Sequence, residues 1–338
     1  MKQHQPKNIL VINLKYLGDL IVSTAAIRAI KESFPESKIT LLVRSEYKDV
    51  LSGNKNIDRI ITYDLTIKKL KRLERLNAEF EFLKYLRSYK FDAVVSLQAG
   101  DRYVFWSYFS GAKIRVAPIE NNFSFLLSAK AKVYEDEVSY MDYYLKIAES
   151  FGAGIKTKSL DFIPHEKYRD WAEEFLRAKG IFAQDKIVGI HPGASEPTKM
   201  WPIENYLKLI DLISMDVNTE VILFLGPMEK KNFIFDGIMK SKVVIADTSE
   251  SIHHLAWLLS KCSLLICNDS GARHLSAALQ TPTITLFPDD KIIPWKFYTE
   301  KEKQFFILGK RNTNNPDNPF LDSITVEEVF QKVKEILN

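Results

Sequence analysis

The sequence predicts an α/β protein built from two doubly wound domains, each with a parallel sheet. Two observations carry this prediction: β-rich apolar runs alternate with helical patterns, and the alternation occurs in two successive series. The length of 338 residues agrees, because a single hydrophobic core usually stops growing at roughly 250–300 residues.

The first series predicts five strands and three helices. Short apolar runs that are typical of buried strands occur at 8–14, 38–44, 57–64, 92–98 and 114–119. Helical patterns cover 20–34, 66–90 and 139–152. The first helix is expected to end before Pro35, the second is strongly basic, and the third closes with a glycine.

The second series repeats this pattern. Strands are expected at 186–193, 220–226, 243–246, 263–269 and 283–287, with helices between them. Further helices are expected at 168–180, at 202–214 and in the tail, which opens with a capping-box spacing from Thr325 to Glu328. The loose stretch 153–166 is the expected boundary between domains 1–160 and 161–338, and the last helix is a candidate to pack back on the first domain.

The fold class also predicts where a ligand binds. In open α/β sheets the ligand lies outside the carboxyl ends of the strands. With two such sheets, the expected site is the cleft between two facing domains.

The composition is that of an ordinary globular protein, with 46% apolar and 27% charged residues. No stretch reaches the roughly 20 apolar residues needed to cross a bilayer, and the opening residues lack a signal-peptide pattern. A cytoplasmic location is therefore expected. Cys262 and Cys267 do not have the spacing of a metal site, and we interpret them as buried small apolar residues.

The net charge of +4 is unevenly distributed. Residues 1–160 carry a net charge of +8 and the remainder carries −4, so an anionic partner is expected for the first half. Nucleic acid is one such partner, but no zinc finger or other nucleic-acid-binding signature is present. A membrane surface or a phosphorylated glycolipid fits the charge equally well.

Gly18 and Asp19 lie between the first expected strand and the first expected helix. Glycine lets a backbone approach a ligand closely. An aspartate at a helix start most simply caps the helix. The functional alternative is a carboxylate base positioned in the cleft.

The second candidate is the loop His191–Ser195 and the lysine that follows it, Lys199. Gly193 and Ser195 belong to a short loop whose backbone N–H groups suit a diphosphate, and Lys199 adds positive charge. The loop is not a P-loop, because the G-x-x-x-x-G-K-[ST] pattern is absent. Taken alone, Lys199 is interpreted as a solvated lysine.

The third candidate is the strand-to-helix junction Asn268–Gly271. Ser270 and Gly271 can open the helix and present free N–H groups to phosphate oxygens. Asp269 can bind sugar hydroxyls, and His274 lies on the same helical face as Ser270. A capping aspartate and a packed histidine explain the same residues without any ligand.

Glu229 follows the expected strand 220–226, where its carboxylate is a candidate to bind a ribose diol. A dinucleotide dehydrogenase would show the same strands, but G-x-G-x-x-G is missing after every one of them. H-E-x-x-H and G-x-S-x-G are also absent, which disfavours a zinc protease and an α/β-hydrolase.

Together these motifs resemble glycosyltransferase family 9, the ADP-heptose:lipopolysaccharide heptosyltransferases. The opening blocks of that family resemble ILVINLKYLGDLIVSTAAIRAIKESFP, IDRIITYD and FDAVVSLQAGDR. Its two donor-domain signatures resemble IHPGAS with KMWPIENY, and CNDSGARHLSAALQTPTITLF. The similarity spans most of residues 8–287 in the family's order.

The resemblance implies a GT-B architecture, with an N-terminal acceptor-binding domain and a C-terminal domain for a nucleotide-sugar donor. It implies inversion at the anomeric carbon, no metal and no other cofactor. Asp19 would be the general base, and Lys199 would neutralise the departing diphosphate. The implied donor-binding residues are Gly193, Ser195, Lys199, Glu229, Asp269, Ser270, Gly271 and His274.

The acceptor implied by the resemblance is the lipopolysaccharide inner core on a lipid A-core precursor, an anionic glycolipid that agrees with the basic first half. The candidate acceptor-facing or membrane-facing residues are Gly18, Lys68, Lys69, Lys71, Arg72 and Arg102. For each basic residue, a solvated helix face is the alternative. The protein is then expected to be peripheral on the cytoplasmic face of the inner membrane, with no nucleic-acid partner.

Three places depart from the family pattern near the expected donor sugar. FPDD follows the last strand where the family has a glycine-containing turn, Ala272 and Arg273 precede the histidine, and Gln280 stands where glycine is frequent. Two alternatives therefore stay open. One is transfer from another nucleotide sugar, and the other is a non-catalytic protein that binds nucleotide sugars or glycolipids.

Overall fold

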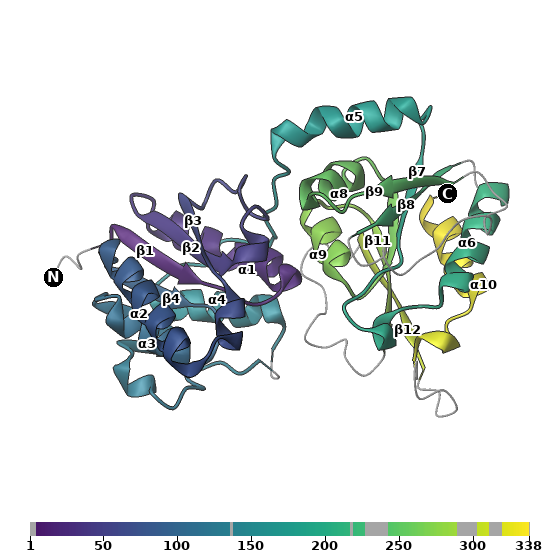
Figure 1. Ribbon diagram of the computed structural model, residues 1–338. Coiled ribbons are helices and arrows are strands. Elements are labelled where there is room, and N and C mark those ends of the chain that lie inside the picture. Colours follow the sequence, from purple (N-terminus) through teal and green to yellow (C-terminus); the bar gives the residue numbers. More distant parts are fainter. Residues whose placement is uncertain are drawn as a thin grey trace. The chain divides into compact units, whose positions relative to one another are not determined.

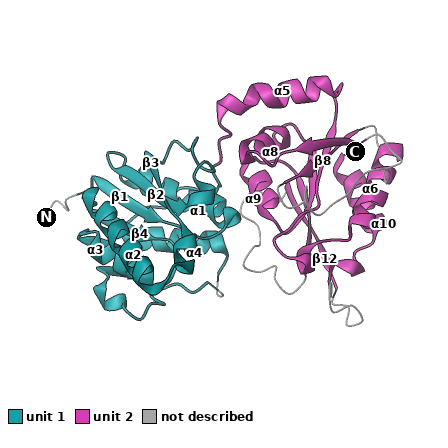
Figure 2. Ribbon diagram, in the orientation of Figure 1, with its two compact units in different colours: residues 1–161 teal, residues 162–338 magenta. Residues whose placement is uncertain are grey.

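The computed structural model describes residues 5–135, 138–216, 219–226, 243–288, 303–310 and 320–337. The chain divides into two compact units, residues 1–161 and 162–338 (Figure 2). Each unit is a layered α/β structure around one six-stranded sheet (Figure 1). All strand pairings recorded in the two sheets are parallel.

The sheet of the first unit has the order β3-β2-β1-β4-β5-β6. Its strands are β1 (Asn8–Ile12), β2 (Lys38–Arg44), β3 (Arg59–Tyr63), β4 (Ala93–Ser96), β5 (Ile114–Pro118) and β6 (Ala129–Ala131). Its helices are α1 (Leu17–Ser33), α2 (Arg72–Ser88), α3 (Asp101–Phe109) and α4 (Tyr140–Phe151). Helices α1 and α4 pack together, whereas α2 and α3 contribute Leu86 and Trp106 to a shared core on the sheet.

The sheet of the second unit has the order β12-β11-β10-β7-β8-β9. Its strands are β7 (Ile187–His191), β8 (Glu220–Leu225), β9 (Val244–Asp247), β10 (Leu264–Asn268), β11 (Thr283–Pro288) and β12 (Gln304–Gly309). Its helices are α5 (Arg169–Ala178), α6 (Ile203–Asp216), α8 (Ile252–Leu259), α9 (Gly271–Ala278) and α10 (Val326–Leu337). The apolar face of the last helix, α10, packs with α6 in the core of the second unit.

Both sheets have the Rossmann strand order, in which the first and fourth strands of the unit are neighbours. These neighbours are β1 and β4 in one unit, and β7 and β10 in the other. The chain leaves them toward opposite sides, which opens a crevice at their carboxyl ends. The predicted α/β class with two Rossmann-like parallel sheets is confirmed.

The division between the units follows from local hydrogen bonds. The backbone N–H of Asp161 donates to Thr24 Oγ1 at 3.0 Å, and its carbonyl accepts from Asn54 Nδ2 at 3.1 Å. Four residues later, the backbone N–H of His165 donates to His253 Nδ1 at 3.2 Å. The chain is thus tied to one core up to Asp161 and to the other from His165 onward.

The predicted helix 66–90 is wrong at its start, because α2 begins only at Arg72. Residues Leu65–Lys69 form a 3-10 helix capped by Asp64, and Leu70 is extended with ψ of 156°. Three elements were not predicted: α3, β6 and β12. By contrast, α4 ends at Gly152 in the left-handed conformation, as predicted.

Candidate functional site

In the second unit, the predicted donor-side residues come together where β7 and β10 end. Asn268, the last residue of β10, is fully buried and bonds to three groups outside its own strand. Its Oδ1 accepts hydrogen bonds from the Trp201 backbone N–H at 3.1 Å and the Tyr206 hydroxyl at 3.0 Å. Its Nδ2 donates to the Pro192 carbonyl at 2.6 Å. Asn268 therefore fixes both ends of the segment that carries Lys199.

A small charge network surrounds Asp269, the buried residue that follows β10. Lys199, at the end of the 3-10 helix Pro197–Lys199, places its Nζ 3.9 Å from Asp269 Oδ2. Arg273 donates from Nη1 to Asp269 Oδ1 at 3.2 Å. Two cations around one carboxylate leave a net positive charge, which suits a diphosphate.

Arg273 is almost fully buried, and sequence reasoning noted it only as a departure from a pattern. Its guanidinium carbon lies 5.4 Å from the ring centre of Phe287 on β11 and 5.0 Å from that of Phe306 on β12. Stacking on aromatic rings suits the planar guanidinium and helps to offset the cost of burying its charge. No local sequence signal indicates this packing, because Phe306 lies on a strand that was not predicted.

The start of α9 is open to an anion. Ser270 stands at the N-cap with extended backbone, but its side chain makes no capping hydrogen bond. The Ser270 Oγ is buried and has no hydrogen-bond partner among the described residues. Gly271 is the first helical residue, so its N–H belongs to the turn that has no partner within the helix. These donors add to the positive potential around Asp269.

His274 lies one turn into α9 and is buried. Burial, and then the positive charges of Arg273 and Lys199, hold the pKa of His274 well below its usual value. The imidazole is therefore neutral at pH 7. On the β7 side, Gly193 is buried and Ser195 is exposed, whereas Glu229 lies outside the described residues.

In the first unit, Asp19 lies in the first turn of α1, the helix that follows β1. Its Oδ2 accepts from the Tyr16 backbone N–H at 3.3 Å, so the carboxylate does cap the helix. Its Oδ1 accepts from the Tyr144 hydroxyl at 2.7 Å. Gly18, directly before it, is buried in the same turn. The capping interpretation holds, and the carboxylate lies at the carboxyl end of β1, where an open α/β sheet binds its ligand.

Sequence reasoning missed two neighbours of Asp19. One is Tyr144 on α4, 125 positions away in the chain. The other is Lys15, whose ammonium pairs with Glu135 and lies 5.3 Å from the ring centre of Tyr140. Burial lowers the pKa of Lys15, and the charge of Asp19 opposes this shift. The sequence alone shows a lysine four residues before Asp19 in the loop between strand and helix, and this spacing could have indicated Lys15 as a neighbour of Asp19.

The predicted basic residues do not all share one environment. Lys68 and Lys69 lie in the 3-10 helix before α2, Lys71 is the N-cap of α2 and Arg72 is its first residue, and all are exposed. Arg102 on α3 is instead engaged within the unit, because its Nη2 lies 3.2 Å from Glu79 Oε1.

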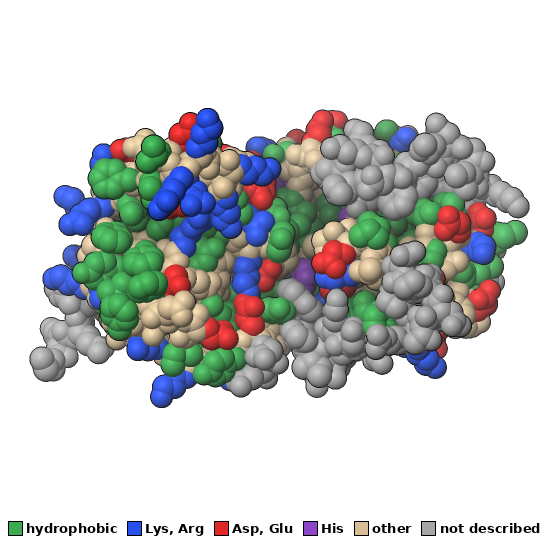
Figure 3. Space-filling model, turned by 60° about the horizontal axis from the view of Figure 1, so that its bottom comes forward, with side chains coloured by type: hydrophobic (Ala, Val, Ile, Leu, Met, Phe, Trp, Pro, Cys, Tyr) green, Lys and Arg blue, Asp and Glu red, His purple; other side chains and the backbone are tan. Residues whose placement is uncertain are grey.

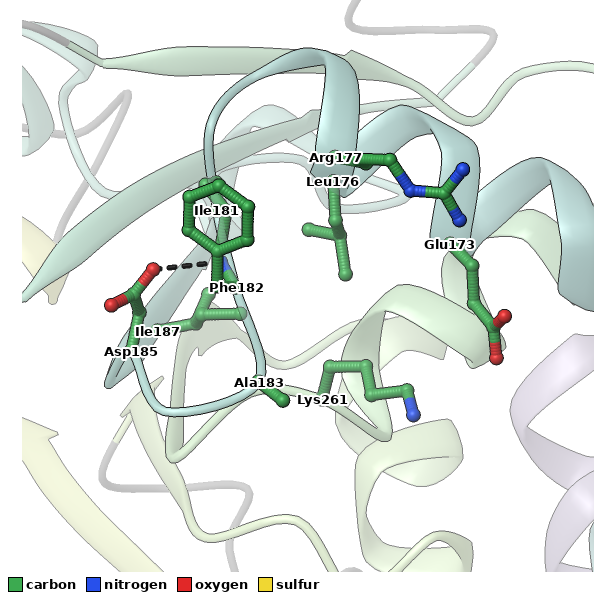
Figure 4. A pocket seen from close by; sticks show the side chains of 9 residues that line it. All are labelled: Glu173, Leu176, Arg177, Ile181, Phe182, Ala183, Asp185, Ile187 and Lys261. Carbon is green, nitrogen blue, oxygen red and sulfur yellow. Dashed lines mark hydrogen bonds between the residues drawn. The ribbon is translucent and has the colours of Figure 1, made fainter.

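A separate pocket of about 390 Å³ lies at the opposite edge of the second sheet (Figure 4). It is bounded by the segment before β7 and by Lys261 after α8, so it opens at the amino ends of the strands. Its apolar floor includes Leu176, Ile181 and Ile187, with Arg177 at the rim (Figure 4). Its position separates it from the donor-side residues.

Two further properties concern the described part of the chain. It contains no group of three or more His, Cys, Asp or Glu side chains placed to hold a metal ion. None of its helices is long and apolar enough to cross a membrane.

Cys262 and Cys267 are buried, and burial raises the pKa of each thiol to about 12. They pack as apolar side chains, as predicted.

Comparison with known proteins identifies a family model and curated relatives that match this chain. The model for "Glycosyltransferase family 9 (heptosyltransferase)" matches residues 80–318. The curated lipopolysaccharide heptosyltransferase 3 of Escherichia coli K12 is 22% identical to this chain, with 96% of each chain covered.

Two solved structures share the fold. The glycosyl transferase family 9 protein of Veillonella parvula has a TM-score of 0.82 and 22% identity, covering 98% of this chain and 97% of its own. The E. coli heptosyltransferase WaaC with ADP-2-deoxy-2-fluoro heptose has a TM-score of 0.75 and 18% identity, covering 97% of this chain and 99% of its own.

The two Rossmann-like units therefore form the GT-B fold of a glycosyltransferase. Within that class, the chain belongs to glycosyltransferase family 9. The resemblance drawn from the sequence motifs is confirmed, and so is the assignment of the protein as a glycosyltransferase.

Proposed function

We propose that the protein transfers heptose from ADP-heptose to the inner core of lipopolysaccharide, with inversion and without a metal. The observation that carries this proposal is the positive site at the end of β10, where Lys199 and Arg273 surround Asp269 beside the open start of α9. The names of the relatives agree, since they include lipopolysaccharide heptosyltransferases. A structural neighbour was solved with a fluorinated ADP-heptose.

On the donor side, the departing ADP gains negative charge as the glycosidic bond breaks. Lys199, together with the backbone N–H groups of Ser270 and Gly271, is proposed to stabilise that charge, the task a metal ion would otherwise perform. Asp269 keeps further lone pairs for sugar hydroxyls, because each carboxylate oxygen accepts more than one hydrogen bond. His274 is neutral and lines the site, and Gly193 and Ser195 offer the loop backbone.

On the acceptor side, Asp19 is proposed to take the proton from the attacking hydroxyl. Its two oxygens are held by the Tyr144 hydroxyl and the Tyr16 N–H, which fixes the carboxylate plane and leaves lone pairs for the acceptor. Tyr144 is a positioning residue in this scheme. Inversion requires the acceptor hydroxyl to attack the anomeric carbon from the face opposite the leaving ADP.

The proposed acceptor is an anionic lipid A-core precursor, and Lys68, Lys69, Lys71 and Arg72 are proposed to face it or the membrane that holds it. The protein would then be peripheral on the cytoplasmic face of the inner membrane, without a nucleic-acid partner. The exposed positions of these four residues support that role. Arg102 is a weaker candidate, since it is already paired with Glu79.

The test measures ADP release from ADP-heptose, with and without a delipidated core acceptor. Acceptor-dependent release is expected from the wild type and not from Asp19→Ala. The matched control is Asp142→Ala, because Asp142 occupies the same first-turn position in α4 and its Oδ2 accepts a hydrogen bond from the hydroxyl of the N-cap residue Ser139 at 2.8 Å. Wild-type turnover in Asp19→Ala would contradict the role of the base. Equal loss in Asp142→Ala would show that removing a carboxylate from the first turn of a helix alone explains the effect.

A second candidate is transfer from another nucleotide sugar, which the buried Arg273 beside Asp269 favours. A cation that occupies one oxygen of the sugar-binding carboxylate changes which hydroxyls that carboxylate can accept. A binding panel of ADP-, UDP- and GDP-sugars separates the two candidates. A preference for a uridine or guanosine donor would replace ADP-heptose in the proposal.

A further inference from the structure

Helix α2 carries an apolar stripe that its own unit does not cover. The helix packs on the sheet through Phe82, Leu83 and Leu86 near its end. Closer to its start, Leu73 is 80% exposed, and Leu76 and Phe80 are each 56% exposed. Leu70, just before the helix, is 43% exposed. Large apolar side chains exposed in sequence on one helix are unusual for a surface that meets only water.

The three helical residues lie on one side of α2. With about 100° between successive residues, Leu73, Leu76 and Phe80 fall within an arc of about 60°. The spacing i, i+3, i+7 is that of an amphipathic helix whose apolar side seeks an apolar partner. This side lies next to the face that Leu83 and Leu86 turn to the core, so α2 has a buried face and an exposed apolar stripe.

The charges around the stripe are mainly positive. Residues 65–88 contain seven basic side chains against three acidic ones. Glu74 and Glu81 lie more than about 100° around the helix from the middle of the stripe. Lys84 lies beside it, with its Nζ 4.5 Å from the ring centre of Phe80. On the face drawn in Figure 3, hydrophobic and basic side chains lie next to one another over the first unit.

We propose that α2 docks on an anionic lipid bilayer, with the Leu73–Leu76–Phe80 stripe in the boundary between headgroups and acyl chains. The flanking cations then meet lipid phosphates, the arrangement that holds in-plane amphipathic helices on membranes. Charge selects this occupant. A second copy of the chain would bring two positively charged segments together. An anionic bilayer instead offers its acyl chains to the stripe and its phosphates to the cations.

This inference deepens the proposed peripheral location and does not depend on which sugar is transferred. If the proposed reaction fails, no ADP is released, yet membrane binding is still measurable. If the docking proposal fails, ADP release with a delipidated acceptor remains. The two results are therefore distinguishable.

The experiment is vesicle co-sedimentation of the full chain. The vesicles are either a phosphatidylethanolamine–phosphatidylglycerol mixture or phosphatidylcholine alone. The test variant is Leu73→Ser/Leu76→Ser/Phe80→Ser. The matched control is Phe182→Ser/Met215→Ser, which removes two apolar side chains that are 54% and 85% exposed on the second unit. Folding is checked by circular dichroism, and oligomeric state by light scattering.

The wild type and the control variant are expected to bind the anionic vesicles and to bind phosphatidylcholine weakly. The stripe variant is expected to bind the anionic vesicles at least tenfold more weakly, about 1.4 kcal/mol, with ADP release from a delipidated acceptor unchanged. Undiminished binding by the stripe variant, or equal loss in the control variant, overturns the proposal. It is also overturned if the wild type does not bind the anionic vesicles, whether or not the oligomeric state differs between the wild type and the stripe variant.

Discussion

Replacing Asn268 by alanine removes the tether between β10 and the segment that carries Lys199. Three buried groups would lose their partner: the Trp201 N–H, the Tyr206 hydroxyl and the Pro192 carbonyl. A buried polar group left without a partner costs about 1–3 kcal/mol. The three together give about 3–9 kcal/mol, and local relaxation brings the expected loss of unfolding free energy to about 3–5 kcal/mol.

The matched control is Tyr206→Phe, which deletes only one of the three bonds. Asn268 Oδ1 keeps the Trp201 N–H, so the expected loss is about 1 kcal/mol. Urea unfolding of each full-length variant gives the difference from the midpoint and slope. Because Lys199 sits on the released segment, Asn268→Ala is also expected to raise the donor KM at temperatures where the protein stays folded, and Tyr206→Phe is expected to change it little.

Two results would refute this reasoning. If Asn268→Ala costs no more stability than Tyr206→Phe, the bonds to Pro192 and Trp201 do not hold the segment. If the stability falls as expected but the donor KM is unchanged, the segment is held for folding alone and Lys199 does not act on the donor.

Three further predictions concern neighbouring residues. Arg273→Met leaves Asp269 without its buried partner and is expected to cost about 3–5 kcal/mol by urea unfolding; a change under 1 kcal/mol would contradict a stabilising pair. Because the pKa of His274 is depressed in the folded state, the unfolded chain binds a proton at about pH 6 that the native chain does not bind. The contribution of His274 to stability is therefore fully present at pH values above the unfolded pKa of 6.5, and it decreases as the pH falls below that value. Between pH 6.5 and 5.5 wild type is expected to lose about 1 kcal/mol more than His274→Gln, and equal slopes would contradict the shift. Tyr144→Phe is expected to lower kcat roughly tenfold without changing ADP affinity, since a misplaced base forfeits part of its contribution; an unchanged kcat would remove Tyr144 from the scheme.

The fold was predictable because its strands are buried on both faces. Such strands read as short apolar runs, and runs such as 38–44 coincide with β2 to the residue. The start of α2 was not predictable in the same way. Its helical pattern continues through Lys68, but the cap at Asp64 and the extended Leu70 interrupt it. The strand β12 gave no clear signal among its neighbours, although it completes the second sheet.

The candidate site was partly predictable for a geometric reason. The parallel strands of one sheet bring their carboxyl ends to one edge, so Asp19 and Asp269 could each be placed beside the crevice of its own sheet from chain order alone. Their partners could not. Tyr144 reaches Asp19 from a different helix, and Asn268 acts through groups more than sixty residues away. These contacts depend on packing, which chain order does not reveal.

The electrostatic arrangement at the end of β10 gives the buried Arg273 a role in the proposed diphosphate site. If Lys199 faced Asp269 alone, the pair would be neutral and the lysine would be committed to the carboxylate. Arg273 instead donates to Oδ1 at 3.2 Å, while Lys199 stays 3.9 Å from Oδ2. The closer cation neutralises the carboxylate, and the longer pair leaves Lys199 able to turn to an incoming anion. The same two cations favour a neutral His274, so positive charge is concentrated on Lys199, which we propose stabilises the leaving group.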